Sequence, residues 1–177
     1  MVYVFLADGF EEVEAIEPID IMRRAGIEVT TVSLGDAPVV GAHNITVKAD
    51  IVIDEVNKDD IEAVVLPGGM GHEKLDASAS VHSLINYAVA GNKLICAICA
   101  APSILGKKQL LFDKKATCFP GYEKYLYGAE VVEDKVVKDG NFITAKGAGA
   151  AADFGFEITA ALRDRETADK IKAIMQY

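Results

Sequence analysis

The chemically most suggestive residue is a cysteine placed where a buried strand is expected to turn into a helix. Cys99 stands in the run Ala97-Ile98-Cys99-Ala100-Ala101-Pro102, directly after apolar residues. A strand that turns sharply into a helix exposes the residue at the bend, and small neighbours let the turn close. Free N–H groups at the start of the helix would favour a thiolate. The pattern predicts a nucleophilic Cys99; the alternative is a small buried hydrophobic residue.

A second segment of interest is the glycine loop Leu66-Pro67-Gly68-Gly69-Met70-Gly71, which follows another buried run. Consecutive glycines let the backbone approach a ligand closely and direct N–H groups toward it. The N–H groups of Gly68, Gly69 and Ala100 could therefore form an oxyanion hole. The alternative is a tight turn that needs positive φ.

The third segment, Gly9-Phe10-Glu11-Glu12-Val13-Glu14-Ala15, joins the first expected strand to the first expected helix. Glu11 and Glu12 are interpreted as capping and dipole partners of the helix N-terminus. Helical spacing places Glu14 on a different face. A carboxyl group beside a thiolate has a raised pKa and can donate its proton to the sulfur. The sequence thus permits a contact between Glu14 and Cys99, without deciding it.

The other cysteines do not extend this site. Cys96 and Cys99 have the C-x-x-C spacing, but in a strand their Cα atoms lie about 10 Å apart. A disulfide tolerates about 7 Å, and no further cysteine or histidine pair completes a zinc set. Cys96 is predicted to be core, and no metal is expected. Three cysteines, with Cys118 as the third, suit reduced thiols in the cytoplasm.

The elements that would position these loops alternate between β-rich and amphipathic stretches, which is typical of an α/β fold. We expect a mostly parallel sheet with helices on both faces, so that the strand-ending loops meet at one edge. The expected strands are 2–6, 27–32, 63–66, 93–98, 116–118 and 142–144, with a peripheral hairpin in 39–53 and a meander in 130–138. The expected helices are 12–25, 80–90, one from 102 onward, 151–162 and 166–175.

Length, composition and charge exclude several classes of protein. The chain has 177 residues, of which 51% are hydrophobic, and a net charge of −9. This length indicates one domain over residues 1–177. The acidic balance argues against nucleic-acid and anionic-membrane partners. The longest apolar run, 94–101, is far shorter than the roughly 18 residues of a membrane span. The apolar start, 1–7, is interpreted as a strand rather than a signal peptide.

Together the three loops, in this order and spacing, resemble the ThiJ/PfpI superfamily. The segments 18–26 (PIDIMRRAG) and 146–149 (KGAG) place the resemblance more narrowly in its DJ-1-like branch. The resemblance spans almost the whole chain. It implies a flavodoxin-like three-layer sandwich of the class I glutamine amidotransferase type, usually a homodimer, without a cofactor.

Carried over to this chain, the resemblance makes Cys99 the reactive cysteine and Glu14 the protonated glutamate on its sulfur. Gly69 and Ala100 match the N–H donors, and Gly147 lies in the later loop near them. The activities implied are glyoxalase or deglycase action on small dicarbonyls such as methylglyoxal. The alternative is a redox-responsive chaperone or oxidation sensor, and an inert homologue is a third reading.

One departure concerns histidine. Several members of the superfamily have a histidine where this chain has Phe119 before Pro120, so a Cys-His pair is not available there. Ala100 directly after Cys99 also disfavours the peptidase branch. His43 and His72 stay candidate accessory residues, although solvent-exposed loop positions are expected for both. His82 is expected on the exposed face of a helix.

Overall fold

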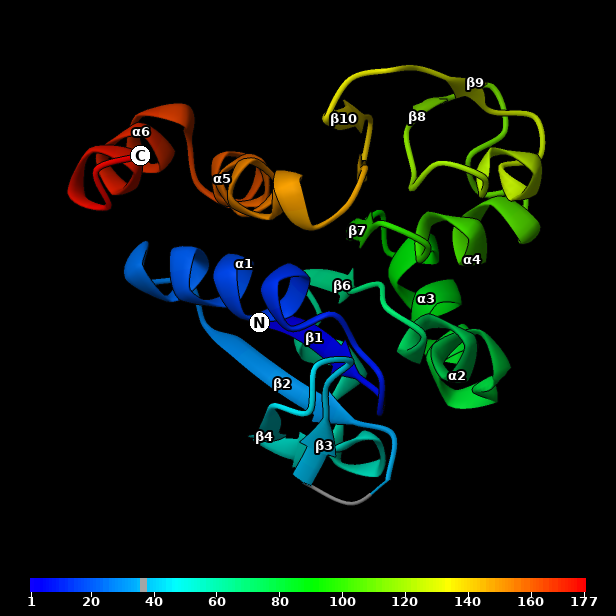
Figure 1. Cartoon of the computed structure of the whole chain (residues 1–177), viewed down its shortest axis with the longest axis horizontal. Coiled ribbons are helices and arrows are strands. Elements are labelled where there is room, and N and C mark those ends of the chain that lie inside the picture. The colour runs from blue at the N-terminus through cyan, green and yellow to red at the C-terminus, as the bar shows by residue number, and fades with distance from the viewer. Residues whose placement is uncertain (36–37) are drawn as a thin grey trace.

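The computed structural model describes residues 1–35 and 38–177, and its centre is a seven-stranded β-sheet (Figure 1). The strands lie in the order β10-β11-β7-β6-β1-β2-β5. Neighbouring strands run parallel except β10 and β11, which form an antiparallel hairpin at one edge. The strands are β1 (Val2–Leu6), β2 (Val29–Ser33), β5 (Ile51–Val52), β6 (Ala63–Leu66), β7 (Leu94–Ile98), β10 (Val136–Asp139) and β11 (Phe142–Ala145).

Helices cover both faces of the sheet, as the sequence predicts for a doubly wound α/β fold. One face carries α1 (Glu12–Arg24) and α5 (Ala151–Leu162), with α6 (Arg165–Ile174) packed against α5. The other carries α2 (Gly71–Ala77), α3 (Ala79–Ala90) and α4 (Pro102–Lys107). Figure 1 shows these two groups on opposite sides of the central strands. The predicted three-layer architecture is confirmed.

Alternation along β1 explains why both faces are buried. Val4 and Leu6 belong to the hydrophobic cluster beneath α1 and α5, whereas Phe5 belongs to the cluster beneath α2, α3 and α4. Successive strand side chains point to opposite faces, so an all-apolar strand needs cover on both. All three side chains are fully buried.

The pair α1 and α5 packs closely because Gly155 has no side chain. A Cβ at this position would lie 2.9 Å from the Cα of Pro18 and 2.9 Å from Cδ1 of Ile21. The two helix backbones therefore approach more closely than ordinary side chains would allow. This contact fixes α1, the helix that carries the predicted Glu14, against the sheet.

The order of the strands places the three predicted loops at one edge. From β1 the chain fills β2 and β5 on one side, and then crosses to β6, β7 and β11 on the other. Parallel strands all end at the same edge, and the reversal of direction leaves a crevice there. Phe10 and Gly69, from the loops after β1 and β6, form an isolated antiparallel bridge at this point.

Most element predictions are confirmed, and the differences have local causes. Helix α2 was not predicted; it starts immediately after the glycine loop and includes His72. The hairpin consists of β3 (Pro38–Val40) and β4 (Thr46–Lys48). The predicted meander is wrong, because β9 (Glu130–Val131) does not pair with β10: it pairs in parallel with β8 (Lys115–Ala116), whereas β10 pairs with β11. A two-residue strand carries too little pattern to reveal its partner.

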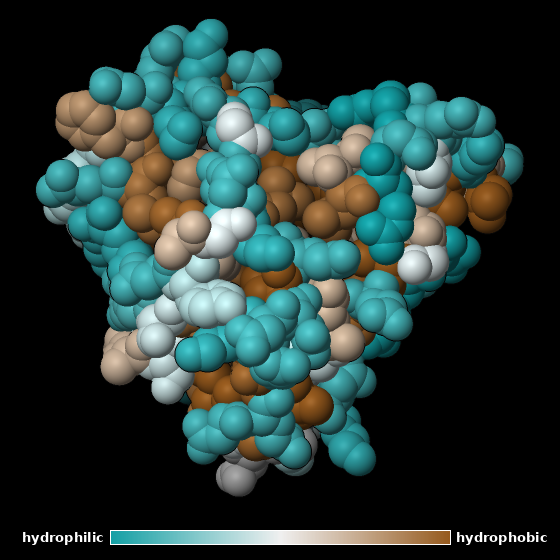
Figure 2. Space-filling model, turned by 180° about the vertical axis from the view of Figure 1, so that it is seen from behind, coloured by the Kyte–Doolittle hydropathy of each residue, from teal (hydrophilic) through white to brown (hydrophobic). Residues whose placement is uncertain are grey.

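The helices that the structure describes were compared with the length and polarity that a membrane span needs. Within residues 1–35 and 38–177, every helix is too short or too polar to cross a bilayer. Figure 2 shows the face turned away from the viewer in Figure 1, where hydrophilic side chains surround smaller hydrophobic areas.

Candidate active site

Cys99 occupies the bend between β7 and α4 in a left-handed backbone conformation. Its φ is +65°, which is uncommon for a residue with a side chain. The bend is held on both sides, because the Cys99 N–H donates to the Ala145 carbonyl at 2.9 Å. The Cys99 carbonyl accepts from the Phe119 N–H at 2.8 Å. The predicted strained elbow with a partly exposed thiol is thus present in the structure.

Glu14 projects from α1 into the crevice at the same strand ends. It is 1% exposed, although it is an acidic residue on a helix. One carboxylate oxygen, Oε2, accepts the Gly68 N–H at 2.9 Å. The carboxyl group also hydrogen-bonds the Cys99 side chain and accepts from the Ala148 N–H. The two predicted partners therefore meet in the structure.

The Gly68 N–H binds the Glu14 carboxylate, whereas Gly68 was predicted to bind an oxyanion. A Cβ on Gly68 would lie 2.6 Å from the Cys99 Cβ and 2.6 Å from the Glu14 Oε2. Only glycine fits between the two side chains, and its N–H is already used by the carboxylate. The prediction that Gly68 belongs to an oxyanion hole is wrong for this reason.

Gly69 and Ala100 present their backbone N–H groups to the Cys99 sulfur, where they act to lower the pKa of its thiol. Gly69 has a φ of +70°, and a Cβ there would lie 2.6 Å from the Glu11 nitrogen. The glycine is thus required both by its conformation and by the close approach of the first loop.

The ionisation of the pair differs from the sequence expectation. Burial raises the pKa of the Glu14 carboxyl to about 7. Burial, followed by the adjacent Glu14 charge, raises the pKa of the Cys99 thiol to about 12. These surroundings do not favour the low thiol pKa expected from the helix N-terminus, because burial disfavours the thiolate and the adjacent carboxylate opposes a second negative charge. Between these two values the pair holds one proton, and a thiolate exists only when Glu14 carries it.

The three histidines lie in different surroundings. The His43 side chain is 68% exposed, as predicted. His72 is buried within α2, and its Nδ1 lies 2.7 Å from the Gly69 carbonyl oxygen. The predicted exposed loop position for His72 is thus wrong, because α2 begins at Gly71 and packs its second residue, His72, into the interior. His82 is half-buried beside Asp76 rather than on an exposed face.

Phe119 and Gly147 form an apolar wall beside the carboxyl group. Phe119 is 47% exposed. A Cβ on Gly147 would lie 3.4 Å from the Phe119 ring and 3.7 Å from the Glu14 Oε1. The aromatic ring therefore stands near the site without any group that can carry a proton. Glu14 is the titratable side chain in contact with the sulfur in the described part of the chain.

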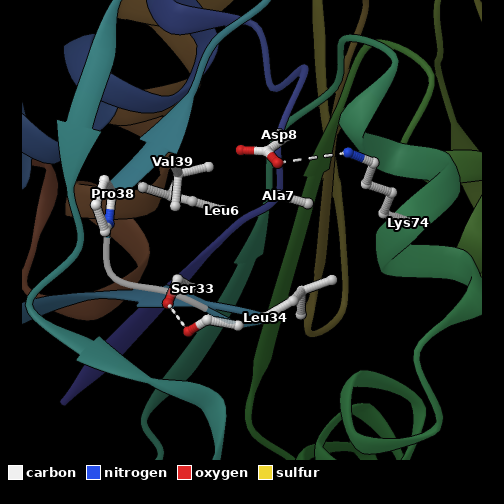
Figure 3. A pocket seen from close by; sticks show the side chains of 9 residues that line it. Leu6, Ala7, Asp8, Ser33, Leu34, Pro38, Val39 and Lys74 are labelled. Carbon is white, nitrogen blue, oxygen red and sulfur yellow. Dashed lines mark hydrogen bonds and ion pairs between the residues drawn. The ribbon is translucent and has the colours of Figure 1, made fainter.

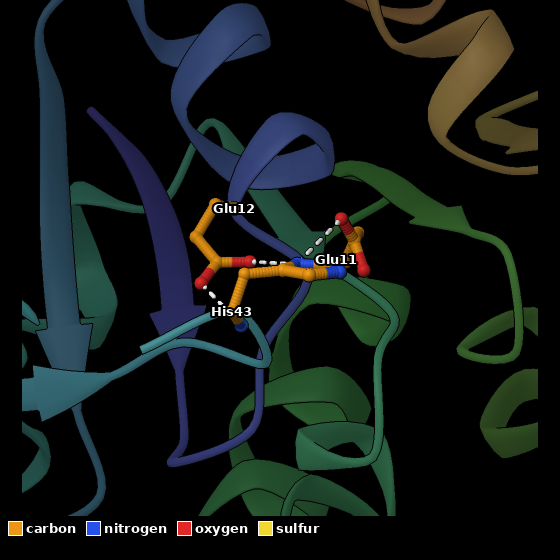
Figure 4. Close-up of side chains that lie close together, drawn as sticks. All are labelled: Glu11, Glu12 and His43. Atoms are coloured by element: carbon orange, nitrogen blue, oxygen red, sulfur yellow. Dashed lines mark hydrogen bonds and ion pairs between the residues drawn. The ribbon is translucent and has the colours of Figure 1, made fainter. Parts of the chain in front are cut away.

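A cluster that the sequence interpretation missed lies beside the glycine loop (Figure 4). Glu12 accepts the His43 N–H at 2.7 Å, and its other oxygen lies 2.8 Å from the His43 Nδ1. Burial alone would raise the pKa of Glu12, but hydrogen bonds from the His43 ring and from backbone N–H groups lower it to about 2. The capping role predicted for Glu11 and Glu12 is wrong, because Glu11 makes no side-chain cap and Glu12 binds the hairpin loop.

A separate hollow lies at the ends of β1 and β2 (Figure 3). Asp8 and Lys74 face each other across it, with the Asp8 carboxylate 3.7 Å from the Lys74 Nζ. Its described lining includes neither Cys99 nor Glu14. The hollow is therefore distinct from the thiol site.

Comparisons with known proteins agree with this geometry. Residues 1–161 match the DJ-1/PfpI family. Protein dj-1beta of Drosophila melanogaster is 38% identical over 172 residues, which span 95% of this chain and 92% of that protein. A protein of Pyrococcus abyssi named as a deglycase is 32% identical, covering 82% of this chain and 89% of its own length.

Solved structures give the same result. Toxoplasma gondii DJ-1, in an oxidised form, superimposes with a TM-score of 0.94 at 33% identity, covering 99% of this chain and 97% of that one. Drosophila melanogaster DJ-1beta gives a TM-score of 0.92 at 36% identity, covering 99% and 96% of the two chains. The similarity extends over both the fold and almost the full length of the sequence. This chain belongs to the DJ-1/PfpI family.

Proposed function

We propose that this protein is a protective enzyme that converts small reactive dicarbonyls, such as methylglyoxal, to hydroxy acids. The observation that carries the proposal is the contact between the Cys99 thiol and the buried carboxyl of Glu14, with N–H donors from Gly69 and Ala100. A nucleophile, a proton carrier and oxyanion donors are the groups that such a conversion needs. The similarity to a protein named as a deglycase supports the same substrate class.

The proposed reaction starts when Glu14 holds the shared proton. The Cys99 thiolate attacks the aldehyde carbon, and the resulting alkoxide takes the proton from Glu14 to give a hemithioacetal. The Glu14 carboxylate then removes the proton on that carbon and returns it to the neighbouring carbonyl carbon, while the hydroxyl proton of the hemithioacetal passes to the oxygen of that second carbon. This transfer leaves a thioester of lactate. Water hydrolyses the thioester, which releases lactate and restores the thiol.

The N–H groups of Gly69 and Ala100 are placed to stabilise charge during this sequence. They hydrogen-bond the sulfur in the free protein. When the sulfur is bonded to carbon, the same donors become available to the adjacent oxygen. The backbone bridge between Phe10 and Gly69 fixes the first loop, and the Cys99 backbone bonds to Ala145 and Phe119 fix the loop of Ala100, so little reorganisation is required.

A redox role is a second candidate, and one observation favours it. Two N–H groups and a carboxyl group surround the Cys99 sulfur, so oxygens added to sulfur would find hydrogen-bond donors. Peroxide would oxidise the thiolate to a sulfenate with release of water, and a second equivalent would give the sulfinate. The proposed role is then that of an oxidation sensor or redox-responsive chaperone.

We also propose that the protein forms a homodimer through an apolar patch on α1. The patch combines Val13 and Ile16 of α1 with Ile45 from the β3–β4 loop and Met175 after α6, and three acidic residues of α1 lie at its border, Glu12, Glu17 and Asp20. Val13 is 47% exposed and Ile45 is 55% exposed, which is unusual for contiguous apolar side chains on a monomer. A second copy of the chain is the proposed occupant, because the resemblance to the family implies a dimer.

Turnover of methylglyoxal tests the enzymatic proposal. We expect the purified protein to form lactate and Cys99→Ala to lose activity by about 100-fold or more, because the nucleophile is removed. Cys118→Ala is the matched control, since Cys118 is a buried cysteine outside the site. Equal activity in Cys99→Ala and the unaltered protein would contradict the mechanism.

Intact-mass analysis after mild peroxide treatment tests the redox candidate. We expect two added oxygens at Cys99 and none at Cys96, which is fully buried. Glu14→Leu should reduce the yield of the doubly oxidised form, because it removes the hydrogen bond to sulfur. Oxidation spread evenly over the three cysteines would contradict a dedicated sensor.

The pH dependence of alkylation tests the shared proton. Below pH 7 both groups are protonated, so the iodoacetamide rate at Cys99 should rise about 10-fold per pH unit as the pair loses its first proton near the Glu14 pKa of about 7. Above pH 7 the rate should level off. In Glu14→Gln this inflection should vanish, leaving a single inflection at higher pH. An unchanged profile in the variant would refute the coupling.

Sedimentation equilibrium tests the dimer. We expect the unaltered protein to sediment as a dimer and Ile16→Glu to sediment as a monomer, because a charge within the α1 patch cannot be desolvated cheaply. Val131→Glu is the control, since Val131 is also an exposed apolar residue but lies on β9. A monomeric unaltered protein, or a dimeric Ile16→Glu, would contradict this interface.

A further inference from the structure

We propose that Glu11, Glu12 and His43 form a binding site for a divalent transition-metal ion such as Zn²⁺. The three side chains come from the first turn of α1 and from the loop between β3 and β4, and they face one another (Figure 4). One ligand atom from each lies within 4.8 Å of the other two. The cluster is separate from Cys99 and Glu14, and the proposed dicarbonyl reaction does not use it.

The distances suit ligands around one ion. The His43 Nδ1 lies 2.8 Å from the Glu12 Oε2 and 3.5 Å from the Glu11 Oε1. Zinc binds nitrogen and carboxylate oxygen at about 2.0 to 2.2 Å, so neighbouring ligands in tetrahedral or octahedral geometry are about 3 to 3.5 Å apart. An ion can therefore replace the proton between Nδ1 and Oε2 with small side-chain shifts.

The central ligand, Glu12, is fixed in place by the protein. Its Oε1 accepts the backbone N–H groups of His43 at 2.7 Å and Ile45 at 3.4 Å. Gly41 leaves the space, since a Cβ there would collide with the Glu12 carboxyl group. The Glu12 side chain is only 7% exposed, and its second oxygen is directed at the imidazole. The protein thus holds one ionised oxygen ready for a cation.

The charge balance at the cluster also favours a cation. In the described residues, neither Glu11 nor Glu12 forms an ion pair with a lysine or arginine. Their shared partner is the His43 imidazole, so two adjacent carboxylates, one of them buried, share a single nitrogen ligand between them. A divalent ion would neutralise both and use the imidazole as its third ligand.

The ligand types select the class of ion. Two carboxylates and one imidazole suit Zn²⁺, Co²⁺ or Mn²⁺, whereas Ca²⁺ and Mg²⁺ prefer oxygen ligands alone. Three protein ligands leave coordination positions for water. Such an ion would also link α1 to the β3–β4 loop. Since the Glu11 N–H donates to the Gly68 carbonyl at 3.2 Å, the bound ion would lie beside the glycine loop.

Calorimetry with Zn²⁺ tests the site in the Cys99→Ala background, which removes the accessible thiol as a competing ligand. We expect one Zn²⁺ per chain, and about 10-fold or greater weakening in both His43→Ala and Glu11→Gln. At a free concentration near 100 times Kd, Zn²⁺ should raise the melting temperature by about 5 to 10 °C. Co²⁺ should give a spectrum without a thiolate charge-transfer band.

A matched control is His82→Ala, because His82 also lies beside a carboxylate, that of Asp76 at 3.5 Å, but without a second one. This variant should bind Zn²⁺ with unchanged affinity. Circular dichroism would show that His43→Ala, a change at an exposed position, stays folded. Undiminished Zn²⁺ affinity in His43→Ala, loss of binding in His82→Ala, or no binding at millimolar Zn²⁺ would each overturn the proposal.

Discussion

The active-site arrangement depends on one proton shared by the Glu14 carboxyl and the Cys99 thiol. Both groups are sheltered from solvent, so a second negative charge between them is strongly opposed, and both pKa values are raised. The carboxyl is thereby kept as a proton donor near neutral pH. In the proposed mechanism, reactivity then follows from the position of that proton and not from a low thiol pKa. This distinguishes the site from those in which a neighbouring cation ionises the cysteine.

Several backbone positions allow the Glu14 carboxyl and the Cys99 sulfur to lie close enough to share a proton. Gly68 separates the two side chains with no room for a Cβ, and the left-handed φ of Cys99 turns the sulfur out of β7. Gly155 allows α1 to lie close to α5, which sets the depth from which Glu14 reaches the crevice. The backbone at Gly68, Cys99 and Gly155 thus positions the contact between the Glu14 carboxyl and the Cys99 sulfur.

Sequence reasoning found the parts of the site that follow a strand end, but not the contacts between distant segments. Cys99 and Glu14 were predictable because apolar runs mark the strands and helical spacing marks the face of α1. The partner of the Gly68 N–H was not, since several acceptors lie near any glycine loop. The pairing of Glu12 with His43 spans 31 residues and depends on how the β3–β4 hairpin folds back. No local pattern carries that information.

The aromatic ring at position 119 limits which side chains near the site can carry a proton. Phe119 lies beside Gly147, near the Glu14 Oε1, and offers neither a donor nor an acceptor. The three histidines are engaged elsewhere, His72 with the Gly69 carbonyl, His43 with Glu12 and His82 with Asp76. In the proposed reaction, Glu14 would therefore be the side-chain acceptor, among the described residues, for a proton that leaves the substrate. The same carboxyl would act first as acid and then as base, and a pKa of about 7 suits both roles at neutral pH.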